Sequence, residues 1–147
     1  ITKDYEKIRY EWAMKEKIII VCGHSHRAIF ESKSRAEEIE DEIEKLQLEL
    51  RRTTDENGQK ELLRKLKKAN RHFLEEQSRG RDIEPFADDP KPCYFNTGCG
   101  LYREGITSIE IEGDIIRLIK WYQRYAADQR RQVLKEAKIG DCLAALS

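Results

Sequence analysis

The sequence lacks any long hydrophobic run and any recognisable targeting signal. Its longest unbroken apolar stretches, residues 18–22 and 142–146, are short, whereas a membrane-spanning helix needs about 20 consecutive apolar residues. The first residues do not show the basic stretch followed by an apolar one that marks a secretory signal. They also include no initiator methionine, so we expect the chain to begin partway through a longer protein. These absences predict a protein with no membrane partner.

Cysteine is sparse and shows no regular spacing. The chain has four cysteines, Cys22, Cys93, Cys99 and Cys142, and none forms a Cys-x-x-Cys pair. Small secreted domains that depend on disulfides carry a denser framework of cysteines. We therefore expect reduced thiols and a cytoplasmic location.

The sequence has no excess of charge of either sign, because 28 Lys and Arg residues balance 28 Asp and Glu residues. Proteins that coat nucleic acids usually carry a basic surface, so we expect no nucleic-acid partner. Charged residues nevertheless make up 38% of the chain, compared with about 25% in typical globular domains. Since 39% of the residues are still apolar, the composition predicts a compact domain that carries a solvated helical arm.

The arm is predicted within residues 31–80, where two helical repeats flank a turn. Ser34 and Glu37 have the spacing of a capping box, in which each side chain bonds the backbone of the other residue. Polar turn residues occupy positions 53–58. Apolar residues recur in steps of three and four on both sides, which predicts two helices of about 18 to 20 residues in an antiparallel hairpin. The expected seam residues are Ala36, Ile39, Ile43, Leu46 and Leu50 before the turn, and Leu62, Leu66, Ala69 and Phe73 after it.

Charge is divided unequally between these two helices. Residues 31–50 contain eight acidic and three basic residues, and residues 60–79 contain seven basic and three acidic residues. Opposite net charges favour pairing of the helices, although exposed ion pairs contribute only about 0.2–1 kcal/mol each. We expect the apolar seam to contribute more.

The rest of the chain, residues 1–30 and 81–147, is predicted to form a compact α/β part. Residues 4–16 have the apolar spacing of a helix. The β-branched residues 18–22 are typical of a strand that is covered on both faces. A further strand is expected at residues 93–98, after a proline-rich loop.

The carboxyl-terminal part is predicted to contain a β-hairpin and a helix. Residues 106–111 and 115–121 are β-branched runs separated by Gly113 and Asp114, which favours a tight turn between two strands. Residues 122–138 have the spacing of a final helix, with Gly140 expected at its end. We interpret Trp12 and Trp121 as core or interface aromatics.

The segment Gly23-His24-Ser25-His26 is the sharpest local feature, because it directly follows the predicted strand at residues 18–22. Neutral imidazole is a good ligand for zinc, iron and manganese. Alternate residues of an extended segment point the same way, so His24 and His26 could bind one metal ion or two adjacent ones. Two alternatives stay open: both histidines are plain loop residues, or they join Cys22, Cys93 and Cys99 in a closed zinc site.

Arg27 and His72 are two further site candidates. Arg27 follows the histidines and suits a substrate phosphate geometrically, although a structural salt bridge is the favoured interpretation. His72 is expected to be a solvated residue of the second arm helix.

The strand and the Gly-His-x-His segment together resemble the last signature of the calcineurin-like metallophosphoesterases. Residues 94–99, Tyr-Phe-Asn-Thr-Gly-Cys, resemble the Asn-x-Gly-Ser segment of that family, with Cys99 where serine is usual. The predicted β-hairpin at residues 106–121 resembles its closing hairpin. These three segments cover about half of the chain in the family's order.

The resemblance implies a layered β-sandwich flanked by helices, of which this chain is the carboxyl-terminal portion with residues 31–80 inserted as a helical hairpin. It implies two divalent metal ions, with manganese, iron and zinc not distinguishable, and it gives His24 to one ion and His26 to the other. Such metal pairs bind phosphate oxygens and activate water for the displacement. The complete protein would then be a phosphatase acting on a phosphoprotein or a small phosphorylated metabolite.

The sequence departs from the family in what it lacks. The earlier Asp-x-His, Gly-Asp and Gly-Asn-His motifs and a further isolated histidine do not occur in it. We therefore expect a missing amino-terminal half to supply the other ligands, and we expect this chain alone to be inactive. The position of the inserted hairpin predicts a lid, a substrate selector or a contact for a homo-oligomer. The alternative function is a non-catalytic interaction module built on the hairpin.

Overall fold

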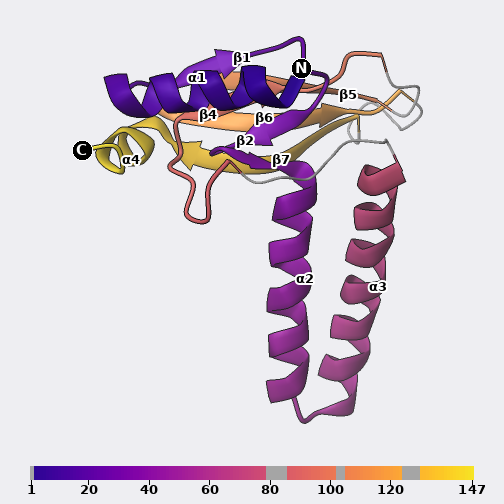
Figure 1. Ribbon diagram of the computed structural model, residues 1–147. Helices are drawn as coiled ribbons and strands as arrows, with labels where there is room; N and C mark the ends of the chain where they lie inside the picture. Colours follow the sequence, from indigo (N-terminus) through magenta and orange to yellow (C-terminus); the bar gives the residue numbers. More distant parts are fainter. Residues whose placement is uncertain (1, 79–85, 102–104, 124–129) are drawn as a thin grey trace. The chain divides into compact units, whose positions relative to one another are not determined.

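The computed structural model describes residues 2–78, 86–101, 105–123 and 130–147. Within this part the chain is a mixed α/β protein with two sheets and four helices, as the sequence predicts at the level of fold class (Figure 1). The chain divides into two compact units. One comprises Ile1–Lys33 and Phe86–Ser147 and contains the α/β core, and the other, Ser34–Pro85, contains the helical hairpin.

The first sheet of the α/β unit holds the strand that precedes the histidines. β1 (Ile20–Cys22) pairs in parallel with β4 (Tyr94–Thr97). β2 (Ala28–Phe30) pairs with the other side of β4 in the antiparallel direction, and β3 (Lys33–Ser34) completes the order β1-β4-β2-β3. Gly-His-Ser-His lies between β1 and β2, at the carboxyl end of β1, beside the end of β4.

The second sheet contains the predicted β-hairpin. β5 (Ile106–Glu112) and β6 (Ile115–Trp121) pair along their whole length, from Ile106 opposite Trp121 to Glu112 opposite Ile115. Gly113 in the turn has a φ of 58°, a left-handed conformation that glycine adopts without a steric cost. The sequence prediction for this hairpin is confirmed.

The predicted final helix is wrong where the structure describes it. Residues 124–129 lie outside the described residues, but β7 (Arg131–Lys138) is a strand that pairs with β6 in the antiparallel direction. Its residues favour helices when taken alone, yet β6 offers an open edge, and tertiary pairing routinely overrides such weak local preferences. The helix α4 (Ile139–Ala144) begins only afterwards, so Gly140 lies inside a helix rather than at the end of one.

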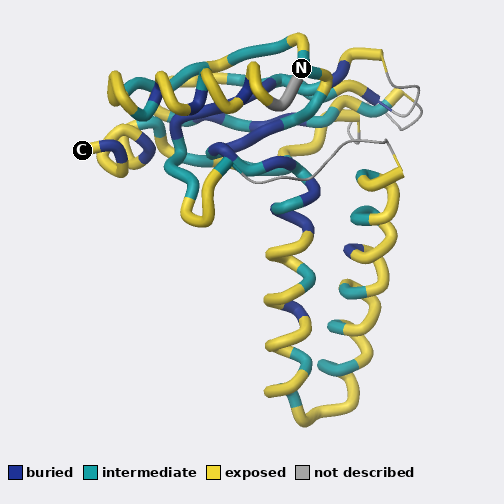
Figure 2. Tube along the Cα trace, in the orientation of Figure 1, coloured by how far each residue is buried: buried dark blue, intermediate teal, exposed yellow. Residues whose placement is uncertain are grey.

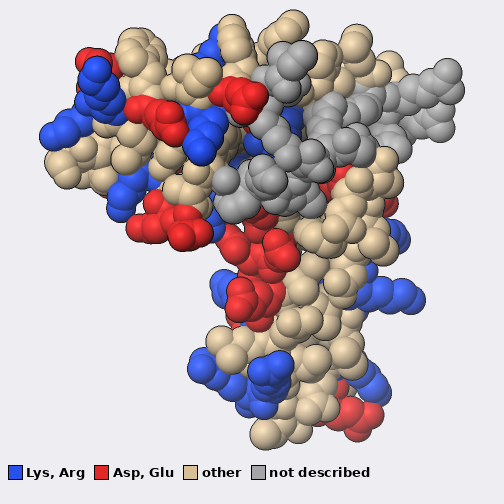
Figure 3. Space-filling view, viewed as in Figure 1, with Lys and Arg blue, Asp and Glu red and all other residues tan. Residues whose placement is uncertain are grey.

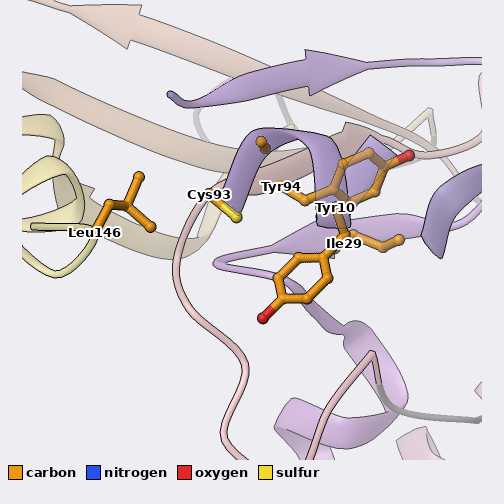
Figure 4. Close-up of a cluster of buried hydrophobic side chains, with 6 residues drawn as sticks. Tyr10, Ile29, Cys93, Tyr94 and Leu146 are labelled. Carbon is orange, nitrogen blue, oxygen red and sulfur yellow. The ribbon is translucent and has the colours of Figure 1, made fainter. Parts of the chain in front are cut away.

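The core of the α/β unit consists of two apolar clusters. The first gathers Tyr10 from α1 (Thr2–Glu16), Ile29 from β2, Cys93 and Tyr94 at β4, and Leu146 near the carboxyl terminus (Figure 4). The second lies around Phe95 and Phe30, whose rings meet edge to face at a centroid distance of 5.1 Å. β4 contributes to both clusters, so the strand beside the histidine loop is anchored on both of its faces.

Two expectations about burial are wrong. β1 is not covered on both faces, because Val21 is 42% exposed and its neighbours are only half-buried. The physical reason is that β1 lies at the edge of its sheet among the described strands. For Trp12 and Trp121, which we interpreted as core or interface aromatics, only the core alternative is wrong, since both are exposed. α1 buries Tyr10 and Ala13 on one face and exposes Trp12, together with Tyr5 and Ile8, elsewhere on its surface.

The second unit is the predicted antiparallel hairpin. α2 (Arg35–Arg52) starts at the predicted capping box, in which the Ser34 hydroxyl accepts from the Glu37 amide and the Glu37 carboxylate accepts from the Ser34 amide. α3 (Glu56–Ser78) returns alongside α2. Their less exposed residues face each other (Figure 2). The seam residues are Ile39, Ile43, Leu46, Leu62, Leu66, Ala69 and Phe73. No helix within the described residues is long and apolar enough to cross a membrane.

Candidate metal-binding loop

The loop that carries the two histidines has an unusual backbone. His24 has a φ of 81° and His26 a φ of 58°, so both adopt the left-handed conformation that costs side-chain-bearing residues free energy. The extended conformation that we expected for this segment is therefore wrong. Such strain of about 1–3 kcal/mol per residue persists only where the surroundings enforce it, and it is concentrated at functional sites.

Asn96 enforces this conformation from β4. Its side chain is fully buried, and its amide nitrogen donates to the Ser25 hydroxyl at 2.9 Å and lies 3.5 Å from the Gly23 carbonyl oxygen. The amide group also contacts the Tyr94 hydroxyl at 3.2 Å, and its oxygen accepts from the Gly98 amide at 3.1 Å. One buried side chain thus ties the histidine loop to the end of the neighbouring strand.

His26 makes a further contact with the segment after β4. Its Nδ1 lies 3.2 Å from the Cys99 sulfur, which also accepts from the Leu101 amide at 3.4 Å. Cys99 is buried, whereas the two histidines are exposed. With Nδ1 facing Cys99, Nε2 is the nitrogen of His26 that stays available to a ligand. The contact holds one ring in a defined orientation.

Arg27 makes the salt bridge that we favoured from the sequence. Its guanidinium donates to Glu6 of α1 at 2.5 Å and lies 5.8 Å from the centre of the Phe86 ring. The side chains of Arg27 and Glu6 are only 13% and 2% exposed. The pair connects the first helix to the residue directly after the histidines. Glu6 Oε1 is buried and has no hydrogen-bond partner among the described residues.

The other sequence candidates lie elsewhere. All four cysteines are free thiols. Cys93 is buried beside Ser32, and burial raises the pKa of its thiol. His72 lies in α3, where partial burial lowers the pKa of its imidazole. Across the part of the chain that the structure describes, no group of three or more His, Cys, Asp and Glu side chains is arranged to hold a metal ion.

Sequence reasoning missed the roles of two residues that shape this loop, although one of them, Asn96, belongs to the segment that resembles Asn-x-Gly-Ser. The loop-holding role of Asn96 has no local signal, because its partners lie about 70 positions away in the chain. Glu6 did have a signal in the sequence, since it shares the face of α1 that buries Tyr10 and Ala13. A carboxylate among buried positions requires a partner of opposite charge, and Arg27 fulfils that requirement.

The sequence matches no protein-family model, and neither the curated proteins nor the solved structures include a significant match to it. The assignment of a function therefore depends on the residues and geometry of the loop itself.

Proposed function

We propose that the chain is the carboxyl-terminal part of a dinuclear-metal phosphoesterase of the calcineurin-like type, which hydrolyses phosphate esters. One observation carries this proposal: two exposed histidines, both with strained backbones, lie at the carboxyl end of a strand, where a buried asparagine fixes their loop. Ligand sites of α/β sheets lie beyond the carboxyl ends of the strands. Lys17, Glu31 and Ser32 also have positive φ, so what sets the histidine loop apart is the combination of two exposed imidazoles with the fully buried anchor Asn96.

The donors fit a metal site in chemical type and in exposure. His24 and His26 offer neutral nitrogen donors, which bind a divalent ion without cancelling the positive charge that a phosphate requires. Two such ions, when bound, supply Lewis-acid activation of the phosphate and of water. Two residues of this chain position the donors: Asn96 fixes the loop, and Cys99 orients the ring of His26 through Nδ1. An amino-terminal part of the same enzyme supplies the remaining ligands in this proposal.

The contact between Arg27 and Glu6 gives Arg27 a supporting role in the proposal. A guanidinium that is held by a buried carboxylate keeps the chain in place directly after His26. We assign Arg27 to loop positioning rather than to direct contact with the substrate phosphate.

The test is made in the complete protein, with an aryl phosphate as the substrate. His24→Ala and His26→Ala should each lower turnover at least about 100-fold and reduce bound metal by elemental analysis, because each change removes a ligand of one ion. His72→Ala is the matched control, since it removes a histidine of the hairpin, and it should leave turnover and metal content unchanged. Normal activity and metal content in both loop variants would refute the proposal.

A second candidate function rests on the hairpin, which forms a compact unit of its own with a separate apolar seam. In this alternative the chain is a non-catalytic interaction module. Deleting residues 34–77 from the complete protein discriminates between the two, because a phosphoesterase should keep its metal content after the deletion. An interaction module should lose binding to its partner after the deletion. It should show no metal-dependent turnover either before or after the deletion.

A further inference from the structure

One lateral face of the hairpin carries two acidic residues near the middle of α2 and a basic residue of α3, with Arg51 of α2 and Glu56 of α3 on the same face nearer the turn. Because an α-helix turns 100° per residue, Glu40 and Glu44 project to the same side of the seam of α2. The same geometry places Leu63, Lys67 and Leu74 on that side of α3. All five side chains are exposed, with Leu63 at 52% and Leu74 at 63%. Figure 3 shows acidic side chains clustered over the first half of α2 and largely uncharged side chains over α3.

The charges of Glu40, Glu44 and Lys67 are not used within the hairpin. Among the described residues, neither Glu40, Glu44 nor Lys67 takes part in an ion pair. By contrast, two other basic residues of α3 are paired along their own helix, Lys60 with Glu56 at 2.9 Å and Arg64 with Glu61 at 2.7 Å. The three charges of Glu40, Glu44 and Lys67 are thus available to a partner.

We propose that the lateral face (Glu40, Glu44, Leu63, Lys67 and Leu74) binds the same face of a second copy of this chain. A two-fold axis parallel to the helices sets α2 of one copy against α3 of the other and brings unlike charges together. A two-fold axis across the helices sets α2 against α2 and α3 against α3, so Lys67 then meets neither Glu40 nor Glu44 of the second copy. Isologous contacts of the first kind close into a dimer, and charge complementarity then fixes its register.

The length of the turn sets the levels of these residues along the hairpin. α2 ends at Arg52 and α3 begins at Glu56, so these two residues lie at similar levels. Each residue adds about 1.5 Å along a helix, so residues of α2 and α3 that are equally far from the turn lie at the same level. By this count Lys67 lies between the levels of Glu40 and Glu44. Rotation about a two-fold axis parallel to the helices leaves the level of every residue unchanged. Lys67 therefore faces the carboxylates of Glu40 and Glu44 in the second copy. Leu63 and Leu74 contribute apolar surface at either side of this contact.

The test uses charge reversal in the full 147-residue chain, with mass measured by sedimentation equilibrium. The wild-type chain should dimerise, and E40K/E44K and K67E should each raise the dimer dissociation constant at least about tenfold, because each change makes the contact repulsive. Combining all three changes exchanges the signs across the interface and should restore dimerisation. Rising salt should weaken the wild-type dimer.

A matched control comes from the opposite side of the same hairpin. E42K/E49K makes the same charge change on α2 away from the lateral face, and it should leave the dissociation constant unchanged. A monomeric wild-type chain would overturn the proposal. A dimer that E40K/E44K and K67E leave intact would overturn it as well, because association would then occur through another surface. A triple variant that stays monomeric would have the same consequence. Metal binding plays no part in these outcomes, so they are independent of the proposed function.

Discussion

The helical hairpin and the α/β unit differ in how far apart in the sequence their stabilising contacts lie. In the hairpin, the capping box joins Ser34 to Glu37, and the apolar seam repeats every three or four residues. In the α/β unit, Arg27 meets Glu6, His26 meets Cys99, and Asn96 meets Ser25 across 21, 73 and 71 positions. The cap and the apolar pattern of each hairpin helix are thus encoded locally, whereas the histidine loop exists only after distant segments have assembled.

The comparison predicts that the two units can be destabilised one at a time. Phe95→Ala empties a fully buried position of the α/β core beside Phe30, which should lower its free energy of unfolding by about 3–5 kcal/mol. Trp12 and Trp121 both belong to this unit, and residues 34–85 contain no tryptophan or tyrosine. Tryptophan fluorescence in urea therefore follows the α/β unit alone, and its midpoint should fall.

Leu46→Ala is the matched change in the hairpin seam. It should lower the urea midpoint measured by helical circular dichroism and leave the fluorescence midpoint in place. If both variants shifted both midpoints equally, the two units would unfold as one, and the comparison would fail.

Alkaline pH should separate the units without any mutation. Burial raises the pKa of Tyr94 to about 12, and burial beside Glu31 raises the pKa of Cys142 to about 11. Both groups hold their protons more tightly in the folded chain than in the unfolded chain. Their contribution to the free energy of unfolding is therefore complete below their ordinary pKa values and is lost as pH rises through their pKa values in the folded chain. A rise of two pKa units corresponds to about 3 kcal/mol.

The hairpin should lose less, because residues 34–85 contain no tyrosine or cysteine, and deprotonation of its lysines removes only exposed ion pairs worth about 0.2–1 kcal/mol each. Urea unfolding followed by fluorescence should therefore weaken between pH 9 and 12, while helical circular dichroism retains the hairpin signal. Tyr94→Phe should reduce the loss of stability, measured by fluorescence, at the alkaline end of this pH range. Tyr5→Phe, at an exposed position, should not reduce it. A profile that Tyr94→Phe leaves unchanged would remove Tyr94 as the cause.

The same difference explains which features the sequence could predict. The capping box, the hairpin seam and the β5–β6 turn depend on neighbours in the chain. The capping box and the turn are confirmed, and so is the seam except for Ala36 and Leu50, which lie outside the apolar cluster. β7 was mistaken for a helix because its strand character comes from the edge of β6 rather than from its own residues. β2 and β3 were missed because they are only three and two residues long.

The two histidines of the candidate site could be singled out from the sequence, but the roles of Asn96 and Glu6 and the geometry of the loop could not. Histidines after a β-branched run identify the loop, because the residue types and their spacing alone carry that signal. Their left-handed backbone and their contacts with Asn96 and Cys99 depend on β4 lying alongside β1. That pairing joins segments about 70 residues apart, and no local pattern specifies it.

The smallest expected effect tests whether the hairpin is local even at its first residue. Ser34→Ala removes the hydroxyl that caps α2 at the Glu37 amide, which should cost about 0.5–2 kcal/mol of hairpin stability. Amide hydrogen exchange in the first turn of α2 should accelerate, while exchange in β4 stays as in the wild type. Ser34→Asp keeps an acceptor at this position and should restore protection. If Ser34→Asp exchanged as fast as Ser34→Ala, the loss would not come from the cap. If β4 also exchanged faster in Ser34→Ala, the start of the hairpin would support the α/β unit, and the two regions would not be separable at that point.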